Sequence, residues 1–172
     1  MKIFFTILLL ILLAFPLIAK SQIKTSIGLE TTSANSNLNY HNSYGFGISS
    51  IIEYTFTLKF GLAAQIGYIH LLPNSYYKSA NMIPLQAIMK FYFNYNDQGA
   101  YMTPMLGIHK HKYTTKEYTI IGQTTPSKTT SITNRSFGFG IGYLTTSKFD
   151  FYFRINWVDS GKYLGLRLAR EF

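Results

Sequence analysis

The sequence predicts an all-β fold, an eight-stranded antiparallel transmembrane β-barrel, and three observations support this prediction. From residue 22 onward, apolar residues alternate with small or polar residues in segments of about ten residues, the length that a tilted membrane strand needs. The connections between these segments are alternately short and long, as they are in membrane barrels. Of all residues, 17% are aromatic and only 13% are charged, which suits a surface in contact with lipid.

The first 21 residues have the pattern of a secretory signal peptide. Lys2 is followed by the apolar run Ile3–Leu17, and the small residues Ala19 and Ser21 precede the first alternating segment. We expect cleavage after Ser21, and an uncleaved membrane anchor is the alternative. The barrel domain then spans residues 22–172.

The mature chain is basic and contains no cysteine. The sequence has 16 Lys and Arg against 7 Asp and Glu, and removal of the two lysines in the signal peptide leaves 14 against 7, a net charge of +7. In so aromatic a chain, this charge points to anionic lipid headgroups and not to nucleic acid. Without cysteine there is no disulfide framework, thiolate metal site or cysteine nucleophile, and no cofactor is expected.

The first half of the barrel domain contains four alternating segments, at 23–30, 44–54, 59–71 and 81–93. One face of each is mainly aliphatic or aromatic, and the other consists mostly of Gly, Ala, Ser and a few ions. The residues predicted to face lipid are Ile23, Thr25, Ile27, Leu29, Tyr44, Phe46, Ile48, Ile52, Tyr54, Phe60, Leu62, Ile66, Tyr68, Ile83, Leu85, Met89, Phe91 and Phe93.

The second half repeats the scheme at 100–110, 135–144, 148–158 and 162–172. The segment 100–110 is the least regular, because Pro104 removes a donor from the strand ladder. In 135–144, glycines at 138, 140 and 142 alternate with aromatic or aliphatic residues, which leaves either a local cavity or a curved strand. The residues predicted to face lipid are Met102, Leu106, Ile108, Phe137, Phe139, Ile141, Tyr143, Phe149, Phe151, Phe153, Ile155, Trp157, Leu164, Leu166, Leu168 and Phe172.

The connections indicate which side of the membrane each end of the barrel faces. Short polar turns are expected at 55–58, 94–99 and 145–147, and long connections at 32–43, 72–80 and 111–134. The long connections are expected outside the cell, although 159–161 on the same side is short. The Thr-rich stretch 124–133 is expected to be mobile and exposed.

The inward face decides between a membrane barrel and a soluble, lipocalin-like barrel, which would enclose its apolar face. Here the polar face carries balanced ions that fit a narrow interior filled by salt bridges, since lone charges there would be costly. The apolar face is too large and continuous for water, which favours the membrane barrel. The predicted interior ions are Lys24, Glu30, Glu53, Lys90, Asp150, Arg154, Arg167 and Glu171.

Two sequence features resemble known outer-membrane proteins. The face formed by Leu164, Leu166, Leu168 and the terminal Phe172 resembles the C-terminal signal of bacterial outer-membrane β-barrels. The stretch Ile83–Phe93 (IPLQAIMKFYF), with Ile52–Tyr54 and Thr57–Gly61, resembles the small outer-membrane β-barrel domain family common in the Bacteroidota. The resemblance covers nearly all of the mature chain. It implies a Gram-negative outer-membrane location, with lipopolysaccharide and the barrel-assembly machinery as partners, and it supplies no catalytic residues.

His41 and Ser43 are weak candidates for catalysis. With Glu53 they resemble the Ser-His-Glu arrangement of the lipid A deacylases, which are outer-membrane barrels. However, Glu53 lies roughly ten residues from Ser43 at about 3.3 Å each, too far for a triad hydrogen bond. We therefore favour a polar loop histidine and an ion-paired glutamate.

His109 and His111 are weak candidates for a metal site, because they share a face at strand spacing. Two imidazoles without a third ligand make a weak site, so we favour a strand that turns into solvent at the barrel rim.

The longest connection carries basic residues that only Glu117 opposes. These residues are candidates for contact with lipopolysaccharide phosphates, and a solvated, flexible loop is the alternative. They are Lys110, Lys112, Lys116, Lys128 and Arg135.

Taken with the fold, these features predict a structural or surface-interaction role through the extracellular loops. A general diffusion pore is not expected, because eight strands leave an interior that side chains can fill. The alternatives are an outer-membrane lipid A-modifying enzyme and a narrow pore or small-ligand carrier; an enzyme is the less expected outcome.

Overall fold

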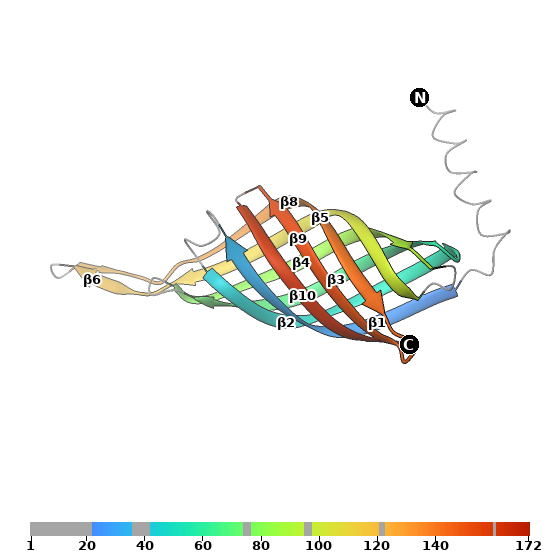
Figure 1. Cartoon of the computed structure of the whole chain (residues 1–172). Helices are drawn as coiled ribbons and strands as arrows, with labels where there is room; N and C mark the ends of the chain where they lie inside the picture. Colours follow the sequence, from blue (N-terminus) through green and yellow to red (C-terminus); the bar gives the residue numbers. More distant parts are fainter. Residues whose placement is uncertain (1–21, 36–41, 74–76, 95–97, 121–122, 160) are drawn as a thin grey trace, which may run out of the picture.

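Eight long antiparallel strands form a closed barrel, as predicted (Figure 1). The computed structural model describes residues 22–35, 42–73, 77–94, 98–120, 123–159 and 161–172. Within these ranges, no helix is long and apolar enough to cross a membrane. The barrel strands are β1 (Gln22–Asn35), β2 (Asn42–Thr57), β3 (Phe60–Pro73), β4 (Tyr77–Tyr92), β5 (Gly99–Thr115), β8 (Thr129–Leu144), β9 (Phe149–Val158) and β10 (Gly161–Glu171). The predicted signal peptide lies outside the described residues.

The barrel is closed by β1 and β10, which pair from Ser26↔Glu171 to Asn35↔Lys162. Phe172 continues this pairing beyond β10, because its N–H donates to the carbonyl oxygen of Thr25 at 2.8 Å. The last strand therefore joins the first, as the resemblance of the C-terminal segment to barrel signals implies.

The apolar face of every barrel strand points outward. Leu29 is 66% exposed, Leu166 59% and Phe151 52%, whereas the ionic residues that alternate with them are buried. Because a soluble barrel would enclose this apolar face, the lipocalin-like alternative is wrong. The outward row of β5 includes Pro104, Leu106 and Ile108, so the irregular segment also follows the alternation.

Strands β4, β5 and β8 continue past the rest of the barrel as a projecting sheet, seen at the left of Figure 1. We define this projecting sheet as Tyr77–Ser79, Lys110–Thr115 and Thr129–Arg135, together with the tip hairpin of β6 (Tyr118–Ile120) and β7 (Gln123–Thr125). β5 and β8 stay paired as far as Thr114↔Thr129.

The prediction of one long loop over 111–134 is therefore wrong at both of its ends. Residues 129–133 of the expected mobile Thr-rich stretch lie in β8, and residues 111–115 lie in β5. The expected connections 32–43 and 72–80 are also shorter than predicted, because β1 reaches Asn35, β3 reaches Pro73 and β4 begins at Tyr77. Thr and Tyr, which recur in these segments, favour extended backbone even where no apolar face is needed.

Candidate functional site

The centre of the barrel is occupied by an ion pair between Arg154 of β9 and Glu30 of β1. Their Nη2 and Oε2 atoms lie 2.8 Å apart, and both side chains are almost fully buried. Arg154 also donates to the amide oxygens of Gln65 and Gln86, and Gln65 Nε2 donates to Glu30 Oε1 at 2.6 Å. The sequence predicts only the ions of this network, and the two glutamines are additional members. Their inward position on β3 and β4 is the signal that could have identified them.

A second network surrounds Arg167 of β10. Its Nη1 atom lies 3.3 Å from Asp150 Oδ2, Nε donates to Ser49 Oγ at 2.8 Å, and Nη2 donates to Ser26 Oγ at 2.9 Å. Ser49 in turn donates to Glu30 Oε1 at 2.7 Å. The two arginine networks are thus continuous across the interior.

The short-turn end of the interior holds the other predicted ions. Lys90 Nζ lies 2.8 Å from Glu53 Oε2, and Tyr92 donates its hydroxyl to Glu53 at 2.9 Å. Lys24 lies 3.8 Å from Glu171 Oε1, which also binds Lys148 at 2.8 Å. All eight predicted ions are buried, and they comprise four cations and four anions. A buried set of balanced, hydrogen-bonded charges is the arrangement that a low-dielectric interior tolerates.

Apolar side chains fill the interior above and below the arginine networks. One cluster, toward the short turns, contains Ile51, Ala63, Ile88, Tyr92, Tyr101, Met105, Leu144 and Tyr152. The other, toward the projecting sheet, contains Ile69, Leu71, Ala80, Met82, Val158 and Tyr163, with Tyr113 against it. The interior is therefore filled along its length by apolar clusters and ion pairs, which intermix toward the short turns, where Tyr92 and Tyr101 donate to Glu53 and Asp150.

The glycines of β8 make room for tyrosine rings. A Cβ atom at Gly142 would overlap the ring of Tyr101, and one at Gly140 would lie 2.6 Å from the ring of Tyr152. Tyr101 donates its hydroxyl to Asp150 Oδ1, and the hydroxyls of Tyr152 and Thr103 lie 2.7 Å apart. The space beside Gly140 and Gly142 is thus taken by aromatic side chains, so these glycines do not leave the local cavity that was one of the two alternatives.

The candidate catalytic residues are not brought together with a carboxylate by the described structure. His41 and the side chain of Ser43 lie outside the described residues. The backbone of Ser43 lies near the start of β2, whereas Glu53 lies ten residues further along the strand and binds Lys90 and Tyr92. Glu53 therefore serves the interior network.

His109 and His111 are neighbours on β5, with ring centroids 6.4 Å apart. His109 is completely buried, and its Nε2 atom lies 2.6 Å from the hydroxyl of Tyr163. Among the described residues, no three His, Cys, Asp or Glu side chains gather as a metal site. His109 thus belongs to the interior packing, and the suggestion that it turns into solvent is wrong.

The five basic candidates are all exposed, and we call them the basic belt: Lys110, Lys112, Lys116, Lys128 and Arg135. Lys110 and Lys112 face outward on β5, opposite Thr133 and Ser131 of β8. Arg135 follows two residues after Thr133 on the same outward face, and its N–H donates to Asp159 Oδ2 at 2.9 Å.

Directly below the basic belt the outer wall carries an apolar groove of about 420 Å³. Leu106, Phe137 and Trp157 line it, and Arg135 and Asp159 form its upper rim. The rings of Phe137 and Trp157 are stacked, with centroids 5.1 Å apart and an interplanar angle of 7°. Positive charge and an apolar surface therefore meet at this level of the wall.

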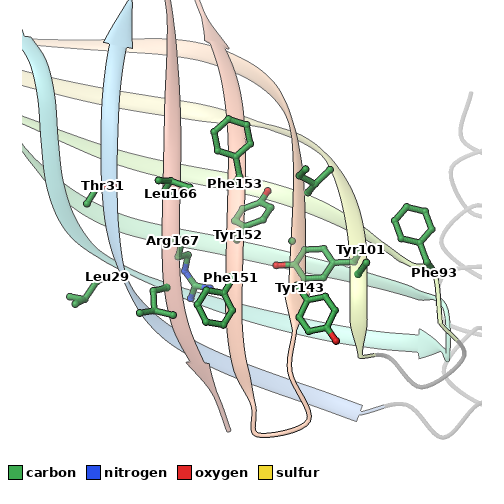
Figure 2. A pocket seen from close by; sticks show the side chains of 14 residues that line it. Leu29, Thr31, Phe93, Tyr101, Tyr143, Phe151, Tyr152, Phe153, Leu166 and Arg167 are labelled. Carbon is green, nitrogen blue, oxygen red and sulfur yellow. The ribbon is translucent and has the colours of Figure 1, made fainter.

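A larger groove, of about 700 Å³, lies on the outer wall across β1, β10, β9 and β8. Figure 2 shows outward side chains such as Leu29, Phe151, Phe153 and Leu166 around it. Arg167 and Tyr152 lie beneath these side chains, within the barrel. This groove is part of the apolar outer surface.

The solved structures that share this fold include three that we describe. Ail, the attachment invasion locus protein of Yersinia pestis, is 15% identical with a TM-score of 0.64, and the match covers 90% of this chain and 100% of Ail. The N-terminal β-barrel domain of Pseudomonas aeruginosa OprF is 17% identical with a TM-score of 0.63, and covers 89% and 100%. Neisserial surface protein A is 12% identical with a TM-score of 0.54, and covers 88% and 97%.

Among curated proteins, a search found no match. A family model, however, matches residues 5–167, nearly the whole sequence, and describes an outer membrane protein β-barrel domain. The closed eight-stranded barrel, its apolar outer wall and its ionic interior agree with that description. The chain belongs to the outer membrane protein β-barrel domain family, and its location is the outer membrane.

Proposed function

We propose that this protein is a non-porous outer-membrane protein that acts at the cell surface through its projecting sheet. One observation carries the proposal: β5 and β8 remain paired well past the apolar wall, while the barrel interior beneath them is filled. A filled interior favours a surface role over a pore or a carrier. The proposal includes export by the signal peptide and an orientation in which the short turns face the periplasm.

The proposal also assigns the basic belt to the phosphates of lipopolysaccharide. Lys110, Lys112 and Arg135 are exposed on the outward face, just above the groove lined by Phe137 and Trp157. Cationic side chains at the headgroup level attract anionic lipid by about 1 kcal/mol each. An acyl chain in the groove would place its own phosphate-bearing headgroup at the level of these charges.

A charge-removal experiment tests the lipopolysaccharide contact. Lys110→Gln/Lys112→Gln/Arg135→Gln is expected to weaken lipopolysaccharide binding roughly a hundredfold, since three contributions of about 1 kcal/mol are lost. Binding would be measured by titrating lipopolysaccharide into the protein in phospholipid nanodiscs.

The matched control, Lys110→Arg/Lys112→Arg/Arg135→Lys, keeps every charge and should bind within a few-fold of the wild type. A second control, Arg170→Gln, removes one exposed charge at the opposite end of the barrel. If the triple Gln variant binds as tightly as these controls, the belt does not recognise lipopolysaccharide.

A further inference from the structure

One edge of the projecting sheet has no neighbouring strand in the described part of the chain. β8 pairs with β5 from Thr129 onward, but it pairs with β9 only from Ser136 to Leu144. β9 ends at Val158, and the chain returns as β10 from Gly161. Residues Thr129–Thr133 are therefore held by β5 on one side and present a strand edge on the other.

The backbone of this edge points its hydrogen-bonding groups away from β5 at alternate residues. The Arg135 carbonyl oxygen accepts a hydrogen bond from the N–H of Asp159 at 3.3 Å, and the Arg135 N–H binds the Asp159 carboxylate, so both groups point toward β9. In an antiparallel ladder every second residue points the same way. The N–H and C=O groups of Thr133 and Ser131 therefore face the edge beyond the end of β9.

The sequence of the edge, TTSIT over residues 129–133, contains no charge and no proline. Natural proteins usually protect an exposed edge with a charged residue, a proline or a bulge. Here the register between β5 and β8 is continuous from Gly99↔Leu144 to Thr114↔Thr129, without a bulge. The edge is thus regular, and it is rich in residues that favour extended backbone.

The charge around this edge distinguishes between possible occupants. Lys112 and Lys110 stand opposite Ser131 and Thr133, and Lys128 and Arg135 flank the edge. A second copy of this chain that paired edge to edge would bring the same positive charges together. An extended segment that carries carboxylates would instead meet opposite charge.

From this arrangement we propose that the Thr129–Thr133 edge binds an extended, acidic segment of another protein by strand addition. In this mode of recognition, main-chain hydrogen bonds hold the added strand, and side chains on alternate positions select it. The segment would lie beside β8, with its outward Asp or Glu side chains facing the positive charge of Lys110 and Lys112 across that strand. The inference rests on the proposed surface role, and it specifies the partner class and the contact.

The test compares two substitutions at one edge position. Thr133→Pro removes the edge N–H and leaves the pairing of β8 with β5 intact, because proline is tolerated on an outward-facing strand edge. Thr133→Val keeps the N–H and the branched shape, and so is the matched control. Both variants in phospholipid nanodiscs, and the wild type, would be challenged with random twelve-residue peptides displayed on phage.

Enriched peptides are expected to alternate acidic with β-branched or aromatic residues. They should bind the wild type and Thr133→Val equally, and Thr133→Pro at least about tenfold more weakly, since a main-chain hydrogen bond is lost and its acceptor is left unpaired. Peptides that bind all three proteins equally would overturn the edge site but not the surface role. Absence of any enrichment over empty nanodiscs would likewise overturn the edge site, while the lipopolysaccharide titration tests the surface role separately.

Hydrogen exchange provides a second readout that does not depend on a substitution. In the wild type, the amides of Ser131 and Thr133 should exchange rapidly and become protected when a selected peptide binds, whereas the amide of Ile132, which faces β5, should be protected throughout. Ser131→Pro serves as a second edge variant if Thr133→Pro fails to fold. Protection confined to the β6–β7 hairpin, or appearing on dimerisation without peptide, would overturn the proposal.

Discussion

Arg154 lies in the middle of the barrel, and its side chain is about 1% exposed. Its positive charge is balanced by a carboxylate in direct contact. Glu30 neutralises it, and the Nη1 group of Arg154 donates to the amide oxygens of Gln65 and Gln86. Removal of one partner from such a buried pair leaves an uncompensated charge, which costs far more than the pair itself contributes.

Arg154→Ala and Glu30→Ala are each expected to lower the free energy of unfolding by about 3–5 kcal/mol. The double variant should lose clearly less than the sum, because no unpaired charge remains. The measurement is urea unfolding in lipid vesicles, followed by the fluorescence of Trp157, the single tryptophan. Arg170→Ala, which removes an exposed arginine, is the control, and additive losses in the double variant would contradict the coupling.

Two roles can be distinguished at Phe172: a contribution to barrel stability, and recognition by the assembly machinery. Its backbone pairs with Thr25, but its ring is 70% exposed and makes no part of the interior. Phe172→Ala is therefore expected to change the refolding of the purified protein in vesicles by less than about 0.5 kcal/mol. In cells, the same variant should accumulate several-fold less folded barrel, because we expect the assembly machinery to bind this aromatic end.

Heat-dependent gel migration of the protein from outer-membrane fractions would measure that accumulation. Phe172→Tyr keeps an aromatic ring and should assemble normally. Equal losses in cells and in purified refolding would show that Phe172 acts on barrel stability and not on recognition.

Sequence parity was sufficient to predict which residues face inward, because a strand alternates sides with a fixed period of two. It could not predict which ions pair. Arg154 and Glu30 are 124 residues apart and are not on adjacent strands, so their contact depends on the tilt and register of the closed barrel. The same limit applies to His109, whose partner Tyr163 comes from β10, 54 residues later.

At the scale of elements, β5 and β8 are longer than the alternation of apolar residues indicated. The apolar period ends where the outer wall ends, but strand pairing continues through Lys112, Tyr113 and Thr114 because both strands remain rich in residues that favour extended backbone. The alternation of apolar residues detects only the part of a strand that lies in the membrane. The extent of the projecting sheet could be seen only from the pairing of β5 with β8.

The tip hairpin is expected to be dispensable for folding. β6 and β7 form a separate two-stranded sheet that pairs with no strand of the barrel. Replacement of residues 116–127 by an Asn-Gly turn should keep β5 and β8 paired, because it joins Thr115 to Lys128, whose backbones already hydrogen-bond, and a two-residue loop of this type suits an antiparallel hairpin. The midpoint of thermal unfolding, read from gel migration, should stay within a few degrees of the wild type.

A deletion in the strands of the projecting sheet itself provides the comparison with the tip replacement. Removal of Lys110–Thr115 with Thr129–Thr133 shortens the sheet itself and exposes the apolar cluster that Tyr113 covers. This variant should unfold at a clearly lower temperature. If the tip replacement is as destabilising as the longer deletion, the hairpin contributes to the barrel and is not an independent appendage.

At the scale of the whole molecule, apolar clusters and buried ion pairs fill the barrel interior and block the passage of ions. Toward the short turns, the first apolar cluster lies among the Lys90–Glu53 and Lys24–Glu171 ion pairs; the arginine networks and the second apolar cluster follow toward the projecting sheet. An ion that entered would have to displace both apolar layers and break buried ion pairs. The wild type is therefore expected to show no steady conductance in a planar lipid bilayer, whereas a sixteen-stranded porin in the same bilayer provides the open control.

Opening the interior should require changes in all three layers. Tyr101→Ala with Tyr163→Ala thins the apolar clusters, and Arg154→Ala with Glu30→Ala removes the central pair without leaving a lone charge. The combined variant should conduct in small unit steps if it folds, while each pair of changes alone should stay closed, because one intact layer suffices to block the path. Steady unit conductance of the wild-type protein would show that the interior layers move apart, and a narrow-pore function would then replace the surface role.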